Sequence, residues 1–126
     1  MENNLWQFSL EFFHMAIWVL ILIGIFLFLV RKCSIKFIVI ATALVTLTLV
    51  SLGAYVRLAD AGLGCPDWPG CYGKLTPESA KGDISAAELI NPNGPVTARK
   101  AWIEMTHRYL ASVVGIMIIA IFVKSP

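Results

Sequence analysis

The chain has 126 residues, of which 58% are hydrophobic and only 14% are charged, and its formal net charge is +2. A water-soluble domain of this size could not easily bury so much apolar surface, so the composition excludes an ordinary soluble domain and indicates a membrane protein. The charges form no basic patch, which argues against nucleic acid as a partner.

Three apolar runs are long enough to cross a bilayer, which requires about 20 residues of helix. The first two cover 12–30 and 37–56, and the third, 101–123, reaches this length only when polar residues near its start are included. The N-terminus is acidic and no small-residue cleavage site follows, so we expect the first run to remain as a helix. The sequence predicts an all-α membrane protein with three transmembrane helices, organised as a single membrane domain over 1–126.

Basic residues predict how the chain is oriented. Several of them lie in the link 31–36 between the first two runs, and Lys124 follows the third run. Cytoplasmic loops are rich in Lys and Arg, so we expect this link and the C-terminus in the cytoplasm. The N-terminus and the loop 57–100 are then extracytoplasmic, in a multi-pass protein of the cell inner (plasma) membrane that contacts membrane lipid.

The outer loop contains the stretch GLGCPDWPGCYG at 62–73, whose glycines and prolines are incompatible with regular structure. Thiols outside the cell are commonly oxidised, so we expect a disulfide between Cys65 and Cys71, which Cys33 on the inner side cannot join. A structural zinc site is not expected, because the loop offers two thiolates and no histidine. The disulfide can be a structural staple or a redox-active pair, and the spacing does not distinguish these roles.

A short helix is expected further along this loop. Its sequence, ISAAELI at 84–90, follows Asp83, a residue type that caps helix N-termini. Ile84 and the other apolar residues of this segment can then rest on the membrane surface. Prolines and a glycine at 92–95 end the helix.

The start of the third run carries an unusual group of ionisable residues. Glu104 and His107 are three residues apart and share a helical face, while Glu104 and Arg108 are four apart and can form an ion pair. Such residues in a membrane span are functional candidates, although all three can instead lie at the water interface. An imidazole beside a carboxylate is typical of a heme iron ligand with a nearby acid or base. His14 is expected at a similar depth, but a histidine near a helix end is more often interfacial than a ligand.

Two motifs in this order, GAYVRLADAGLGCPDWPGCYG and WIEMTHRYLASVVG, resemble the opening portion of the heme A synthase family. Its members are membrane enzymes that oxidise a methyl group of heme O towards the formyl group of heme A. The resemblance covers residues 53–115 and implies part of one of the family's two four-helix halves, preceded here by an additional helix. It also implies heme as the bound group, as heme O substrate, heme b cofactor or both.

The resemblance implies a role for each matching residue. Cys65 and Cys71 match the family's outer-loop cysteine pair, which implies a catalytic disulfide that takes part in redox transfer. Glu104 matches the acidic residue beside the substrate heme that is implicated in the oxidation. His107 matches a heme-ligating histidine, and thus an axial ligand of the heme iron.

Arg57 and Arg108 lie within the same motifs, and guanidinium groups near a membrane surface are suited to heme propionates. The family's later helices, which carry partner histidines, have no counterpart in this chain. The resemblance therefore implies the N-terminal part of a heme A synthase-like oxidoreductase that is not active alone and needs further such helices or an oligomer. Two other functions stay open: a membrane thiol-disulfide redox protein with its own redox partner, and a non-catalytic subunit in cytochrome oxidase assembly.

Overall fold

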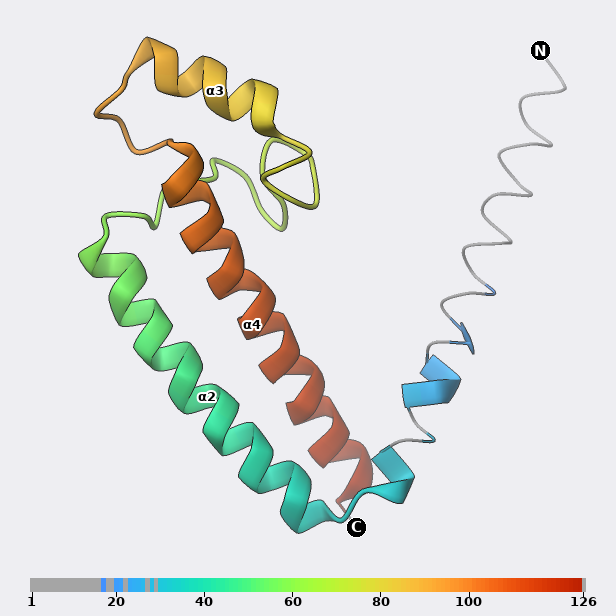
Figure 1. Cartoon of the computed structure of the whole chain (residues 1–126). Coiled ribbons are helices and arrows are strands. Elements are labelled where there is room, and N and C mark those ends of the chain that lie inside the picture. The colour runs from blue at the N-terminus through green and yellow to red at the C-terminus, as the bar shows by residue number, and fades with distance from the viewer. Residues whose placement is uncertain (1–16, 18–19, 22, 27, 29, 126) are drawn as a thin grey trace, which may run out of the picture.

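The computed structural model describes residues 17, 20–21, 23–26, 28 and 30–125, and this part of the chain is helical with no β-strand. Three helices follow one another, listed in chain order as α2 (Ile35–Leu58), α3 (Lys81–Ile90) and α4 (Ala98–Lys124). Figure 1 shows α2 and α4 side by side and antiparallel, with α3 beyond the N-terminal end of α4. The all-α membrane fold expected from the sequence is confirmed.

The expected first transmembrane helix, 12–30, lies largely outside the described residues, and so does His14. Those residues of 12–30 that the structure describes are helical. In the described part of the chain, two helices are long and apolar enough to cross a membrane, namely α2 and α4. The first of the three expected spans, 12–30, therefore stays a prediction.

Helix α2 is built to cross a bilayer. Its N-cap, Ser34, accepts a hydrogen bond from the N–H of Phe37 at 3.3 Å and so satisfies one donor of the first turn. Its 24 residues make it about 36 Å long, more than the hydrocarbon core of about 30 Å. It extends slightly beyond the expected 37–56 at both ends. Large apolar side chains remain exposed along α2, as lipid contact requires: Phe37, Ile40, Leu44, Leu47 and Val50.

Helix α4 begins three residues earlier than the expected 101–123. The hydroxyl of its N-cap, Thr97, accepts a hydrogen bond from the N–H of Lys100 at 3.2 Å. Within the helix, the Thr106 hydroxyl donates to the carbonyl of Trp102 at 2.7 Å. Pairing of this kind satisfies a hydroxyl inside its own helix, which suits a segment surrounded by lipid.

Lys124 closes the end of the helix pair opposite the loop, which we call the link end. Its Nζ donates to the carbonyl oxygens of Val30 at 2.8 Å and Arg31 at 3.1 Å, and also to that of Cys33. A small apolar cluster packs beside these bonds: Val30, Ile38 and Ala120. The link 31–36 and the C-terminal end of α4 therefore lie at the same end of the helix pair.

The opposite end, the loop end, carries residues 59–97 and α3. The expectation that Asp83 caps this helix is wrong, because α3 begins at Lys81 and its cap position is Ala80, which makes no side-chain cap bond. A turn in which the Thr76 and Ser79 hydroxyls bond each other at 2.8 Å leads into the helix earlier than the sequence suggests. Asp83 instead lies in the first turn, where its negative charge interacts favourably with the positive end of the helix dipole.

The apolar residues of α3 do not share one environment. Ile84, expected on the membrane surface, is only 2% exposed and packs against the disulfide and Met105. Leu89 and Ile90, at the end of the same helix, remain exposed. Helix α3 therefore covers the cysteine loop with one buried side chain and leaves its C-terminal apolar pair uncovered.

Candidate functional site

The expected disulfide between Cys65 and Cys71 is present, with the two Cα atoms 4.9 Å apart. Both cysteines are buried, with exposed fractions of 3% and 0%. The residues that cover them come from the loop, from α3 and from the first turns of α4: Ala80, Ile84, Ala101 and Met105. The disulfide is therefore the centre of the apolar cluster at the loop end.

A tight turn follows the second cysteine. The N–H of Cys71 donates to the carbonyl of Lys74 at 2.8 Å, and the reverse bond is 3.0 Å long. Tyr72 and Gly73 between them both have positive φ angles, 51° and 68°, as the favoured two-residue hairpin turns require. The Asp67 carboxylate accepts hydrogen bonds from the N–H groups of Tyr72 at 2.5 Å and Gly73 at 2.6 Å.

These bonds stabilise the charged form of Asp67. The N–H of Gly73 contributes most, followed by that of Tyr72, and the Arg108 charge adds to them, so the pKa of Asp67 is held below its usual range although desolvation opposes this. An aspartate just before a glycine-rich turn commonly bonds nearby backbone N–H groups. The sequence carries this signal in Asp67 and the glycines that follow it.

Two glycines allow close backbone approaches in this loop. A Cβ at Gly64 would lie 2.6 Å from the carbonyl carbon of Lys100, so the loop could not dock against the start of α4. A Cβ at Gly70 would lie 2.1 Å from the carbonyl oxygen of Lys74 and would disrupt the turn. The glycine-rich composition thus has a steric cause at both positions.

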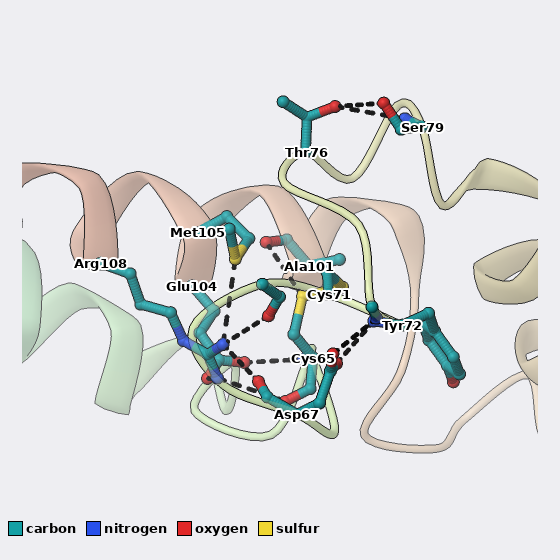
Figure 2. Close-up of a disulfide and its surroundings, with 12 residues drawn as sticks. Cys65, Asp67, Cys71, Tyr72, Thr76, Ser79, Ala101, Glu104, Met105 and Arg108 are labelled. Carbon is teal, nitrogen blue, oxygen red and sulfur yellow. Dashed lines mark hydrogen bonds and ion pairs between the residues drawn. A yellow bond between two sulfur atoms is a disulfide. The ribbon is translucent and has the colours of Figure 1, made fainter. Parts of the chain in front are cut away.

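Glu104 and Arg108 join α4 to the disulfide loop, as Figure 2 shows. The two side chains form the ion pair expected from their spacing, with 2.5 Å between Arg108 Nη2 and Glu104 Oε1. The other carboxylate oxygen of Glu104 accepts the N–H of Cys65 at 2.8 Å. Glu104 is 7% exposed, so this carboxylate lies beneath the loop rather than at the water interface.

Arg108 also binds the loop backbone. Its Nη1 donates to the carbonyl oxygens of Asp67 at 2.5 Å and Gly70 at 2.7 Å, and its Nη2 donates to that of Cys65 at 3.3 Å. All three carbonyls belong to the segment closed by the disulfide. We call Glu104, Arg108 and these bonds to 65–70 the latch.

The two arginines expected near heme propionates differ in their surroundings. Arg57 is exposed in the last turn of α2, and no hydrogen bond or ion pair of its side chain occurs among the described residues. The terminal nitrogens of Arg108 are engaged by the latch. Arg57 therefore has donors available for an anionic group, whereas most donors of Arg108 already have acceptors.

His107 is partly buried and faces α2. A Cβ built on Gly53 would lie 3.1 Å from its Nε2, so the imidazole approaches α2 where that helix has no side chain. Within the described part of the chain, no hydrogen bond joins His107 to Glu104. The structure thus places the two residues on neighbouring turns but in different environments, one against α2 and one beneath the loop.

A cavity of about 500 Å³ lies where the loop meets α4. Trp68 and Pro69 line it from the loop, and Trp68 is 80% exposed. Residues on successive turns of α4 complete the lining: His107, Arg108, Tyr109, Ala111 and Ser112. The cavity combines apolar walls with a few polar groups, as ligand sites commonly do.

The described residues fit a heme better than a bare metal ion. Among them, no three His, Cys, Asp or Glu side chains gather where they could hold a metal directly. Heme iron needs only one or two axial ligands from protein, and a partly buried imidazole beside a cavity is suited to be one. His107 meets these requirements.

The two membrane-crossing helices and the oxidised loop docked onto the polar start of α4 define an all-α membrane protein with a disulfide-bearing loop at one end of its helix pair. Residues 36–125 match the family model described as cytochrome oxidase assembly protein, and the chain belongs to this family. The resemblance to heme A synthases is confirmed by two relatives.

The chain is 44% identical over 81 residues to the heme A synthase of Shewanella oneidensis (strain MR-1). The matched region covers 64% of this chain and 24% of that protein. It is 34% identical over 79 residues to the heme A synthase of Lysinibacillus sphaericus (strain C3-41). Here the matched region covers 63% of this chain and 20% of that protein. The chain thus spans a quarter or less of the length of the curated relatives it matches. No solved structure matches it significantly.

Proposed function

We propose that this chain is the N-terminal part of a heme A synthase-type membrane oxidoreductase, which oxidises a methyl group of heme O to give heme A. The observation that carries the proposal is the docking of the Cys65–Cys71 loop onto the turns of α4 that hold Glu104 and His107. Since the chain covers 24% of its Shewanella relative, the activity is proposed for an assembly with further heme A synthase-type helices, or an oligomer. The chain alone is expected to be inactive.

His107 is the proposed axial ligand of the heme iron. Its Nε2 lies where Gly53 leaves α2 without a side chain, and His107 also lines the cavity between the loop and α4. Arg57, exposed at the end of α2, is the better placed of the two arginines for a heme propionate. A second axial ligand is expected from further helices, because a histidine near a helix end, as His14 is expected to be, is more often interfacial than a ligand. The bound heme, whether heme O or heme b, supplies redox chemistry at its iron.

The cysteine pair is the proposed electron acceptor. Converting a methyl group and water into a formyl group releases four electrons and four protons. A disulfide takes up two electrons and two protons when it becomes two thiols, so the pair would act twice per product. After each two-electron reduction, the disulfide of a thiol-disulfide redox partner would take up these electrons and protons and become a dithiol. Glu104 would accept protons released in the oxidation.

The location of the loop follows from the positive-inside rule. Basic residues gather at the link end, in 31–36 and at Lys124, and this favours a cytoplasmic location for that end. The disulfide loop then faces the extracytoplasmic side of the plasma membrane, where a dithiol can be oxidised.

Heme occupancy of the detergent-purified chain tests this proposal. Extracted heme per chain should fall to background in His107→Ala, because the axial bond holds the iron. The matched control is Thr106→Ala, which alters the adjacent residue, whose exposed hydroxyl bonds only its own helix. Equal heme in both variants and the wild type would reject His107 as the ligand.

A membrane thiol-disulfide protein without heme is the second candidate, favoured by the disulfide itself. This function predicts that Cys65→Ser abolishes activity while His107→Ala is silent. Both cysteines are nearly inaccessible, which disfavours direct attack by a partner thiol unless the loop opens. If the chain has a non-catalytic role in cytochrome oxidase assembly, neither substitution should impair its function.

A further inference from the structure

Thiol exchange at the disulfide requires the loop to move. A thiolate must approach one sulfur atom to form a mixed disulfide, but Cys65 and Cys71 are only 3% and 0% exposed. Ile84 of α3 and Met105 of α4 lie in the cluster that covers them. Any reaction with a dithiol partner therefore depends on how often the loop opens.

The latch is the polar connection that opposes this opening. Arg108 donates to three carbonyls of the closed segment, those of Cys65, Asp67 and Gly70. Its fourth oxygen partner is Glu104, and both side chains are largely buried, at 18% and 9% exposure. The planar fork of a guanidinium can serve several acceptors at once, which the single ammonium of lysine cannot do in the same geometry.

The same bonds position Glu104. Its Oε2 accepts the N–H of Cys65, and its Oε1 pairs with Arg108, so both carboxylate oxygens are held by groups of the latch. When the loop leaves α4, the bond from Cys65 is broken and Arg108 loses its backbone acceptors. Opening the loop therefore frees Oε2 of Glu104 and leaves its ion pair with Arg108, on the same helix, as its remaining bond.

We propose that Arg108 is a positioning residue that couples the two: the oxidised loop fixes Glu104, and reduction of Cys65–Cys71 releases it. In this reduction Cys65 and Cys71 take up two electrons and two protons and become thiols. In the proposed function these come from the methyl group under oxidation, and in a thiol exchange they come from a dithiol whose own sulfurs become a disulfide. The reduced segment gains conformational freedom, which weakens the latch. By reciprocity, a weaker latch makes the disulfide easier to reduce. Any effect of the released Glu104 on oxidation of the heme methyl group rests on the proposed function, but the coupling itself does not.

Reduction kinetics test the coupling without heme. In a Cys33→Ser background, so that only the pair is counted, dithiothreitol is added and free thiols are alkylated and counted by mass spectrometry over time. We expect Arg108→Gln to be reduced at least about tenfold faster than the parent, because the open population rises. The disulfide of Arg108→Lys should also be reduced faster than that of the parent, because lysine cannot satisfy the same acceptors.

The matched control is Arg99→Gln, which removes the same charge from the same helix. Arg99 donates to the Tyr55 hydroxyl and not to the disulfide loop, so its variant should be reduced at the parental rate. Parental rates in Arg108→Gln, or equal acceleration in Arg99→Gln, would overturn the proposal. Circular dichroism checks that the variants keep their helices.

A second measurement needs no change at the latch. Hydrogen exchange at the Cys65 amide reports its bond to Glu104, and we expect this amide to exchange at least about tenfold faster after reduction. Amides within α2 should not change. Unchanged protection at Cys65 would refute the coupling, whereas a chain that shows the coupling but never binds heme would refute only the proposed function.

Discussion

The membrane span of α2 and the loop end of the α2–α4 pair satisfy their polar groups in different ways. Along α2, the hydroxyls of Thr42, Thr48 and Ser51 donate to carbonyls four residues earlier in the same helix. At the loop end, Glu104 and Arg108 bind backbone groups 38 to 43 residues away in the sequence. The spans are thus locally self-sufficient, as lipid demands, whereas the loop end depends on contacts that exist only when the loop is closed.

This contrast indicates where sequence changes should matter. A polar change in a span that leaves its own helix intact removes one local bond. A change at the loop end disturbs the disulfide cluster, the turn after Cys71 and Glu104 together. The predictions below run from the largest expected effect to the smallest.

Gly70→Ala should have the largest effect on loop closure. Its Cβ would lie 2.1 Å from the carbonyl oxygen of Lys74, so the turn must open, at a cost of about 3 kcal/mol. The free energy of opening, measured by hydrogen exchange at Cys71, should fall by this amount. Gly62→Ala is the control, since nothing lies within 4 Å of a Cβ there. Equal effects of the two variants would contradict the steric argument.

Loss of the disulfide comes next. Replacing both cysteines by serine, Cys65→Ser with Cys71→Ser, should weaken loop closure by about 2 kcal/mol, because the open segment then has more conformations available. The Cys65 amide should lose protection while amides of α2 keep theirs. Unaltered exchange at Cys65 would mean that the latch alone holds the loop.

A pH effect should arise from Asp67, whose pKa is lowered in the folded loop mainly by the N–H of Gly73. A depressed pKa contributes stability above the unfolded value of about 4, and this contribution is lost as pH falls through the folded value. Reduction by a phosphine, which works in acid, should therefore accelerate below about pH 4 relative to Asp67→Asn. The ratio of the two rates should approach one at the lowest pH; a constant ratio would exclude Asp67 as the cause.

Thr48→Ala in α2 should have the smallest effect. Its hydroxyl donates to the Leu44 carbonyl of its own helix and is exposed, so we expect a change within about 0.5 kcal/mol in thermal unfolding. Reduction of the disulfide should proceed at the wild-type rate. A large effect here would show that the spans are less self-sufficient than their bonding indicates.

The sequence predicted what depends on local composition. Apolar length located α2 and α4 within three residues at every end, and the four-residue spacing of Glu104 and Arg108 predicted their ion pair. The pairing of the two loop cysteines was also predictable, because Cys33 lies at the opposite end of the helix pair.

What the sequence did not predict depends on the path of the loop back to α4. The bonds of Arg108 to three carbonyls involve atoms that any residue type would supply, so no side-chain pattern marks them. The start of α3 was misplaced because the Thr76–Ser79 turn, and not Asp83, leads into the helix. The expectation that Ile84 rests on the membrane surface was wrong because the side chain is buried against the folded disulfide, a contact between segments far apart in the sequence.

The measurement that tests the account most directly is the absorbance spectrum of the purified chain, reduced with dithionite, for the wild type and for the Cys65→Ser, Cys71→Ser double variant. If the loop and α4 form one heme site, the wild type should show a reduced heme band, and the double variant should retain less heme per chain. The absence of heme from the wild type, or the same band and occupancy in both proteins, would contradict this account.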